Sequence, residues 1–252
     1  MNTIYEPSGK AKEYSPLALN LYNGCSHGCT YCYAPRCLHK TPENFRLAPM
    51  PRTGIIEQLK KDVKKFVGDT RPILMCFTGD PYVPVEATYK ITRQAIEIMG
   101  EAGLKMKVLT KNGQLATRDC DLFKKYGVEV GQTIIFADDS LRQIYEPGAS
   151  SIQSRFDAVR FFYQQGIKTW VSVEPVIYEF QALSVIDQLN PFVDHWKIGK
   201  LNHDTQREKE INWTKYLWDA LNAVHPDSSY YVKDGIWAFA DERTKVRFAK
   251  ER

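Results

Sequence analysis

The stretch "NGCSHGCTYCYAPRC" at residues 23–37 places four of the six cysteines of this 252-residue chain within thirteen positions. Such a concentration predicts a disulfide framework, a zinc site or an iron–sulfur cluster. The chain begins with the polar segment "MNTIYEPSGKAKEYSP" and shows no apolar secretory signal there, so we expect a cytoplasmic protein. Disulfides are rare in that reducing compartment, which counts against the first arrangement.

Cysteine spacing helps to separate the two remaining arrangements. Cys25, Cys29 and Cys32 follow the pattern C-x3-C-x2-C, and no second Cys or His pair follows at zinc-finger spacing. Three thiolates on a [4Fe–4S] cluster leave one iron open for another ligand. We therefore favour a cluster on these three cysteines and keep zinc, and buried structural cysteines, as alternatives. We expect ordinary thiols at the other three cysteines, which are Cys37, Cys76 and Cys120.

Short apolar runs alternate with amphipathic helical patterns along the chain. The runs are typical of buried parallel strands, and we predict strands at 18–22, 73–77, 106–110, 128–136, 168–173 and 195–199. Between them we predict helices at 55–67, 91–102, 118–126, 154–165 and 181–189. Gly103, Gly127 and Gly166 each stand between a helical pattern and an apolar run. A helix commonly ends there in the left-handed conformation, which glycine adopts without a steric penalty.

The alternation predicts an α/β fold. Strands joined by helical crossovers form parallel βαβ units, and a closed barrel of this type needs eight of them. With six convincing strands we predict a partial (β/α)6 TIM-type barrel, and a doubly wound open sheet is the alternative. We assign residues 1–205 to the core barrel with a short N-terminal lead-in. Residues 206–252 form a C-terminal extension that packs on the barrel, with a helix at 213–224 and an apolar run at 229–240.

Polar residues follow every predicted strand. In barrels of this type the chemistry lies at the carboxyl ends of the strands, and the cysteine motif follows the first one. We expect these strand ends to face one cavity. The net charge of +4 permits a nucleic-acid ligand without indicating one, and no apolar run is long enough to cross a membrane.

Taken together, these motifs resemble the radical SAM superfamily. The series "SPLALNLYNGCSHGCTYCYAPR", "FTGDPY", "LTKNG", "IYEPGASSIQSRFDAV" and "VSVEPVI" is similar to the branch related to spore photoproduct lyase, over residues 15–205. The resemblance implies a [4Fe–4S] cluster on the three cysteines and S-adenosylmethionine (SAM) on the fourth iron. It also implies an external one-electron reductant of the flavodoxin or ferredoxin type. Reductive cleavage of SAM then gives methionine and a 5′-deoxyadenosyl radical that abstracts a hydrogen atom from the substrate.

The same resemblance implies roles for residues at the strand ends. Asp80 stands where the superfamily receives the SAM amino group, and Lys111 suits the SAM carboxylate, so both are catalytic-site candidates. Arg155 has a helix-face salt bridge as its alternative role. Only one of Gln132 and Thr133 points inward, because neighbouring residues of a strand face opposite sides. The further SAM-binding candidates are Tyr31, Thr78, Gly79, Gln132, Arg155, Glu174 and Lys197.

The substrate stays open at this stage. The favoured interpretation is a radical SAM enzyme acting on an unidentified substrate, for which a nucleic acid or a nucleotide is one class. One alternative is a nucleic-acid lesion lyase of the spore photoproduct lyase type. Another is a non-catalytic zinc- or nucleic-acid-binding module. Lys233 lies between Tyr231 and Trp237 in the extension, and it is our candidate for a charge that faces the substrate.

Overall fold

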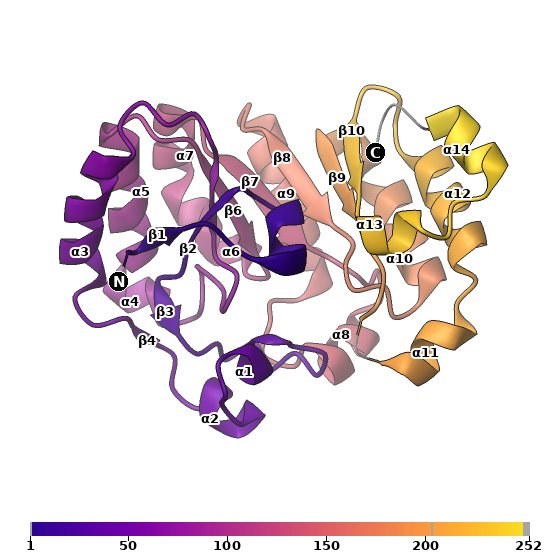
Figure 1. Ribbon diagram of the computed structural model, residues 1–252, viewed down its shortest axis with the longest axis horizontal. Coiled ribbons are helices and arrows are strands. Elements are labelled where there is room, and N and C mark those ends of the chain that lie inside the picture. The colour runs from indigo at the N-terminus through magenta and orange to yellow at the C-terminus, as the bar shows by residue number, and fades with distance from the viewer. Residues whose placement is uncertain (1, 203, 249–252) are drawn as a thin grey trace.

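The computed structural model describes residues 2–202 and 204–248, and at its centre is one eight-stranded sheet (Figure 1). The strand order is β1-β2-β5-β6-β7-β8-β9-β10, with every neighbouring pair from β2 to β10 parallel and β1 antiparallel to β2. A separate antiparallel pair joins β3 to β4. The strands are Ile4–Tyr5 (β1), Leu17–Leu19 (β2), Tyr22–Asn23 (β3), Met50–Pro51 (β4), Ile73–Met75 (β5), Met106–Thr110 (β6), Glu129–Thr133 (β7), Thr169–Ser172 (β8), His195–Ile198 (β9) and Ser229–Val232 (β10).

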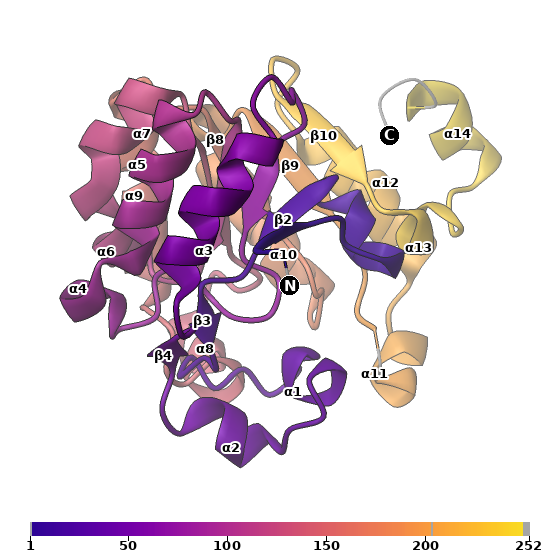
Figure 2. The same ribbon diagram turned by 60° about the vertical axis from the view of Figure 1, so that its left-hand side comes forward.

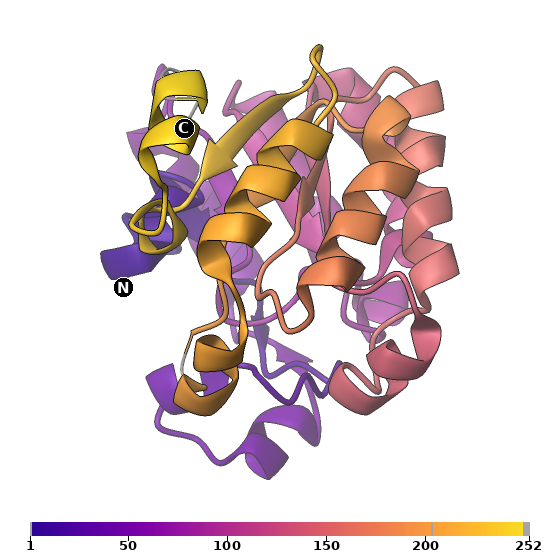
Figure 3. The ribbon, with the colours of Figure 1, turned by 90° about the vertical axis from the view of Figure 1, so that its right-hand side faces the viewer.

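Helices cover the outer face of the sheet. Figure 3 shows the long helices of the second half of the chain, α9, α10 and α12, standing side by side over this face. The α-helices are Ala34–Cys37 (α1), Pro42–Arg46 (α2), Ile55–Asp62 (α3), Glu86–Tyr89 (α4), Ile91–Glu101 (α5), Gly113–Ala116 (α6), Cys120–Tyr126 (α7), Asp139–Tyr145 (α8), Ile152–Gln164 (α9), Glu179–Leu189 (α10), Thr205–Glu210 (α11), Trp213–Ala223 (α12), Asp234–Trp237 (α13) and Glu242–Phe248 (α14). The 3-10 helices are Gly9–Glu13 (η1), Val63–Lys65 (η2), Thr117–Asp119 (η3) and Asn190–Phe192 (η4).

This architecture confirms the predicted partial α/β barrel. The six predicted strands pair in parallel in their sequence order, and β1 and β10 form the two edges of the described sheet. The apolar run at 229–240 supplies β10 as a seventh parallel strand, which the sequence analysis left undecided, followed by α13. The sheet therefore continues from the predicted core into the predicted extension.

The three predicted helix-ending glycines are confirmed. Gly103, Gly127 and Gly166 have φ angles of 72°, 63° and 70°, a region that glycine reaches without a Cβ clash. The residue after each glycine donates a backbone hydrogen bond of 3.0 Å to the carbonyl five residues earlier. This is the Schellman arrangement, and it turns each chain segment from its helix into the next strand.

The first predicted strand, 18–22, is divided in the structure. Its first part belongs to β2, whereas Tyr22–Asn23 leaves the sheet and pairs with β4. The cause is Asn20, whose side-chain Oδ1 accepts hydrogen bonds from the backbone N–H groups of Phe77 and Thr78 at 2.9 and 3.0 Å. These side-chain contacts take the place of strand pairing at this end of β5. The predicted strand at 128–136 likewise ends early, at Thr133.

Two clusters of buried apolar side chains hold the helices on the sheet. One involves β2 and β5–β7 with α3, α5 and α7, and the other involves β8–β10 with α9, α10 and α12. The extension contributes Trp213, Tyr216, Leu217 and Leu221 to the second cluster. Its last four residues, 249–252, lie outside the described residues. No described helix combines the length and the apolar character needed to cross a lipid bilayer.

Candidate functional site

The cysteine loop lies between β3 and α1, at the carboxyl end of the sheet (Figure 1). Its entry is fixed by a hydrogen bond of 3.0 Å from Cys25 N to Phe45 O. Gly24 has a φ of 89°, and a Cβ atom there would lie 2.6 Å from the Phe45 carbonyl oxygen. Glycine at this position therefore lets the loop approach α2 closely. Within the loop, Cys32 N donates to Cys29 O at 3.3 Å.

Cys25, Cys29 and Cys32 are free thiols that influence one another electrostatically. Burial raises the pKa of Cys29 to about 11, with a further contribution from Glu146 and Cys32, while Lys111 acts in the opposite direction. Burial also raises the pKa of Cys25, and the negative charge of Asp80 and the other two cysteines raise it further. Three thiolates here would repel one another. Bound iron supplies the positive charge that stabilises thiolates, so this set of side chains fits a cationic group.

Asp80 connects the cysteine loop to two strand ends. Its carboxylate accepts hydrogen bonds from Thr110 Oγ1 at 2.6 Å, Lys111 N at 2.7 Å and Tyr82 N at 2.8 Å. The His27 Nε2 atom lies 3.1 Å from the same carboxylate, and His27 Nδ1 lies 3.2 Å from a backbone carbonyl oxygen. Burial alone raises the pKa of Asp80, but His27, the Thr110 hydroxyl and the Lys111 backbone N–H together lower it. The ionised carboxylate thus holds the loop beside β5 and β6.

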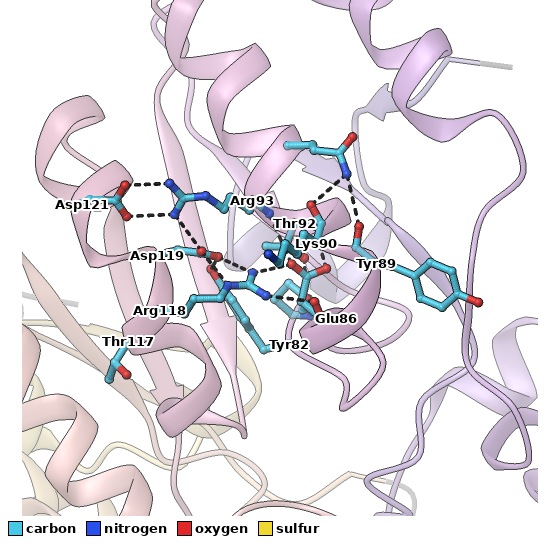
Figure 4. Close-up of polar contacts among 12 residues, drawn as sticks. Tyr82, Glu86, Tyr89, Lys90, Thr92, Arg93, Thr117, Arg118, Asp119 and Asp121 are labelled. Atoms are coloured by element: carbon cyan, nitrogen blue, oxygen red, sulfur yellow. Dashed lines mark hydrogen bonds and ion pairs between the residues drawn. The ribbon is translucent and has the colours of Figure 1, made fainter.

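A buried charge network supports the turn that carries Asp80 (Figure 4). Tyr82 OH donates to Asp119 at 2.9 Å, and the Arg118 guanidinium lies 2.7 Å from Asp119 and 2.6 Å from Glu86. Arg93 reaches the other oxygen of Asp119 at 3.1 Å. Both carboxylates are fully buried, and each is paired with arginine, as buried charges must be. The network fixes Tyr82, and through its backbone N–H it fixes Asp80.

Glu146 is the centre of a second buried group and was missed by the sequence analysis. Its carboxylate accepts a hydrogen bond from Tyr31 OH and lies 2.6 Å from Arg155 Nη1 and 3.9 Å from Lys111 Nζ. Burial raises the pKa of Glu146, but Arg155 and Lys111 together bring it below its ordinary value. Two cations against one carboxylate leave excess positive charge beside Cys29. In the sequence, Glu146 stands directly before Pro147 and Gly148 in "YEPG", and this acidic residue beside a turn is the signal that could have identified it.

Gln132 and Thr133 lie on opposite faces of β7. A Cβ atom on Gly113 would lie 3.1 Å from Gln132 Oε1 and 2.4 Å from Ala158 Cβ, so Gln132 points toward α6 and α9 on the outer face. Strand alternation then places Thr133 on the inner face. Both amide atoms of Gln132 are buried without a hydrogen-bond partner among the described residues.

The turn at Thr78 and Gly79 approaches the cysteine loop closely. Thr78 N donates to Asn20 Oδ1, and Gly79 has a φ of 147°. A Cβ atom on Gly79 would lie 3.3 Å from the Gly24 carbonyl oxygen. The backbone of the "TGD" segment therefore packs directly against the start of the loop that carries the three cysteines.

Glu174, Lys197 and Lys233 come together around Tyr14, on the β8–β10 side of the sheet. Tyr14 OH donates to Glu174 at 2.7 Å, and Lys233 Nζ lies 3.0 Å from the same carboxylate. Lys197 Nζ donates to the backbone carbonyls of Glu13 and Tyr14. Glu174, Lys197 and Lys233 thus lie in one polar group with the segment that follows η1. The other candidates, Asp80, Lys111, Tyr31 and Arg155, form a separate group near the cysteine loop.

These features define a partial parallel barrel with three free cysteines at its carboxyl end, beside a buried acid and a partly buried lysine that follow the neighbouring strands β5 and β6. The chain belongs to the radical SAM superfamily, whose family model matches residues 19–181.

Several curated relatives support this membership. An uncharacterized protein of Methanocaldococcus jannaschii is 30% identical over 192 residues, which cover 75% of this chain and 72% of the relative. An uncharacterized protein of Acidianus two-tailed virus is 31% identical over 189 residues, covering 69% of this chain and 60% of the relative. A radical SAM Nα-GlyT isomerase of Pseudomonas phage M6 is 28% identical over 165 residues, covering 62% of this chain and only 32% of that protein.

Solved structures show the same fold. A variant of spore photoproduct lyase matches with a TM-score of 0.70 at 16% identity, over 90% of this chain and 79% of that one. SuiB of Streptococcus suis, bound to the precursor peptide SuiA, matches with a TM-score of 0.64 at 12% identity, over 91% of this chain and 52% of that one. The predictions of the superfamily and of likeness to spore photoproduct lyase are thus confirmed, and at these identities the structural likeness concerns the fold.

Proposed function

We propose that Cys25, Cys29 and Cys32 hold one [4Fe–4S] cluster and that the chain is a SAM-cleaving radical enzyme. The observation that carries this proposal is the placement of three free cysteines, spaced C-x3-C-x2-C, on one loop at the strand ends of a radical SAM fold. Within residues 2–202 and 204–248, no three His, Cys, Asp or Glu side chains converge as ligands of a single metal ion. Thiolates of a cluster each bind a different iron, so they need not converge on one point. The cysteine spacing and the family match together favour a cluster over zinc.

The SAM amino-acid moiety is proposed to lie between Asp80 and Lys111. Lys111 Nζ lies 3.9 Å from the Glu146 carboxylate, which is also paired with Arg155. One carboxylate does not neutralise both cations, so Lys111 contributes positive charge near Cys29. The Lys111 backbone N–H donates a hydrogen bond to the Asp80 carboxylate, so Asp80 also orients this lysine. When bound, the cluster and SAM supply a 5′-deoxyadenosyl radical. The remaining candidates for SAM contacts are Tyr31, Thr78, Gly79, Arg155, Glu174 and Lys197, whereas Gln132 faces the outer side of β7 and is no longer a candidate.

The substrate class that we propose is a nucleic acid or a nucleotide. One spore photoproduct lyase structure holds a dinucleoside spore photoproduct, which also makes a lesion lyase of that type the second candidate function. Lys233 is the proposed substrate-facing charge, and a substrate phosphate would compete with Glu174 for its ammonium group. We place the enzyme in the reducing cytoplasm with an external one-electron reductant. The division into a core of residues 1–205 and an extension of residues 206–252 remains part of the proposal.

Transfer of deuterium tests the proposed substrate class. The anaerobically reconstituted and dithionite-reduced protein is incubated with SAM and with uniformly deuterated oligonucleotides, nucleotides or a control peptide. We expect deuterium to appear in 5′-deoxyadenosine only with nucleic acid or nucleotide, because the radical takes its hydrogen from the substrate. Irradiated DNA that contains thymine photoproducts tests the lesion lyase, which should restore thymines. Transfer from the peptide alone would contradict the proposed substrate class.

A further inference from the structure

The surface formed by α1 and α2 lies directly beside the cysteine loop. Figures 1 and 2 show the two short helices at the carboxyl end of the sheet, projecting from the body of the molecule. Helix α1 begins two residues after Cys32, and residues 36–44 are all exposed. From α2, the Arg46 guanidinium donates a hydrogen bond of 3.0 Å to the Cys29 carbonyl oxygen. The exposed surface and the cysteine loop are therefore in direct contact.

Positive charge is concentrated on this surface. Residues 33–47 contain three basic residues, Arg36, Lys40 and Arg46, but only one acid, Glu43. Their net charge is 3 − 1 = +2, whereas the whole chain of 252 residues carries +4. Arg36 and Lys40 form no ion pair within the described part of the chain. The surface thus presents unneutralised positive charge to solvent.

Apolar side chains accompany these charges. Tyr33, Leu38 and Leu47 are 45%, 39% and 84% exposed, respectively. Exposed apolar side chains among positive charges are suited to a transient interface, in which opposite charges accelerate association. Two of the three are aliphatic, and the Tyr33 hydroxyl is engaged with the Phe77 carbonyl oxygen at 2.7 Å. Single-stranded nucleic acids instead bind through stacking on aromatic side chains, so the composition of this surface favours a protein partner.

We propose that this α1–α2 surface, residues 33–47, is the docking site of an acidic one-electron carrier of the flavodoxin or ferredoxin type. The inference rests on the proposed function, because only a cluster on the cysteine loop needs an electron delivered there. One electron passes from the reduced carrier to the oxidised cluster, so the carrier is oxidised by one electron and the cluster is reduced by one. No atom is transferred. Contact with Cys29 through Arg46 makes the route from this surface to the loop short.

Charge reversal tests the surface in the reconstituted holoprotein. The variant is Arg36→Glu with Lys40→Glu, and the control is Lys61→Glu with Lys64→Glu. The control makes the same charge change at exposed lysines that form no ion pair among the described residues, on α3 and η2, well apart from α1 (Figures 1 and 2).

Anaerobic stopped-flow absorbance measures cluster reduction by reduced flavodoxin, by reduced ferredoxin and by dithionite. We expect the variant to be reduced by a carrier protein about 10-fold or more slowly than the wild type, with dithionite reduction and the control unchanged. Reduction of the wild type by the carrier should also slow as salt is added.

Equal rates for the variant and the wild type with both carriers would overturn the docking site, as would a wild type that neither carrier reduces. Loss of binding to a labelled oligonucleotide with carrier reduction intact would assign the surface to nucleic acid and would also overturn it. If Arg36→Glu with Lys40→Glu loads no cluster, the neutral variant Arg36→Gln with Lys40→Gln takes its place, with a smaller slowing expected. Failure of the wild type to cleave SAM with dithionite would instead count against the proposed function, and carrier reduction of the cluster would still report on the surface.

Discussion

The Arg155 guanidinium lies 2.6 Å from the Glu146 carboxylate, and neither side chain is exposed to solvent. The two residues come from α9 and from the segment that follows α8, and Glu146 also accepts a hydrogen bond from Tyr31 in the cysteine loop. Removing one member of a buried ion pair leaves the other charge without compensation in a poorly solvated place. This pair therefore links the stability of the fold to the position of the loop.

Arg155→Ala is expected to lower the free energy of unfolding by about 3–5 kcal/mol, the usual cost of breaking a buried ion pair from one side. Denaturant unfolding of the apoprotein measures this change. The matched control is Lys60→Ala, which removes an exposed pair with Glu57 and should cost at most about 1 kcal/mol. The double variant Glu146→Gln with Arg155→Met should lose less than the sum of the single changes. Equal costs for Arg155→Ala and Lys60→Ala would contradict the buried pairing.

Lys111→Ala is expected to weaken SAM binding by about 10-fold or more, since a charged hydrogen bond is lost, while the iron content stays unchanged. Isothermal titration of the reconstituted protein gives the affinity. Lys105→Ala is the control, because Lys105 is exposed and lies just before β6, at the opposite end from Lys111. Unchanged SAM affinity in Lys111→Ala would remove this lysine from the SAM site.

Asp80→Ala should weaken SAM binding by a similar factor of about 10, for the same reason. It should also destabilise the protein, because three donors and His27 lose their acceptor. Asp80→Asn separates the two effects, since an amide keeps one acceptor oxygen but has no charge for the SAM ammonium group. We expect Asp80→Asn to retain the cluster and still to bind SAM weakly. Wild-type affinity in Asp80→Asn would show that the carboxylate charge serves only the fold.

Lys197 predicts a specific pH dependence of stability. Burial lowers its pKa from 10.5 to about 7, and the positive charges of Lys107 and Lys233 act in the same direction. Between pH 7 and 10.5 the unfolded chain binds a proton that the folded chain lacks, so the free energy of unfolding should rise with pH across this window. Lys197→Met removes this contribution. The stability gained by Lys197→Met should therefore be largest below pH 7 and should shrink toward pH 10. A gain that is constant with pH, or that grows as pH rises, would contradict the lowered pKa.

The sequence predicts those parts of the fold that depend on local patterns. Apolar runs located the six strands, and Gly103, Gly127 and Gly166 marked the entry points of three of them, because a helix-ending glycine has a local steric cause. The split of residues 18–22 was not predicted, because its cause is the pairing of Asn20 with Phe77, which is distant in sequence. β10 was left undecided because its apolar run also contains the short helix α13.

The same distinction holds for the candidate site. The cysteine motif is contiguous, so its residues could be named from spacing alone. Glu146 could not, because its partners Tyr31, Lys111 and Arg155 come from three other segments and only the folded chain brings them together. Tyr14 escaped notice for a related reason. Its hydroxyl meets Ser172 and Glu174, which are more than 150 positions away in the chain.

Cys25, Cys29 and Cys32 are the proposed ligands of the cluster at which SAM is cleaved. The most direct measurement is 5′-deoxyadenosine formed from SAM by the anaerobically reconstituted, dithionite-reduced protein, with iron content determined on the same samples. We predict about four irons per chain in the wild type, as one [4Fe–4S] cluster requires, together with 5′-deoxyadenosine and methionine. Alanine in place of any one of the three cysteines should abolish both products and most of the iron, whereas Cys37→Ala, Cys76→Ala and Cys120→Ala should retain them. A wild-type protein that binds one zinc and forms no 5′-deoxyadenosine, or a Cys29→Ala protein that still forms it, would contradict the account.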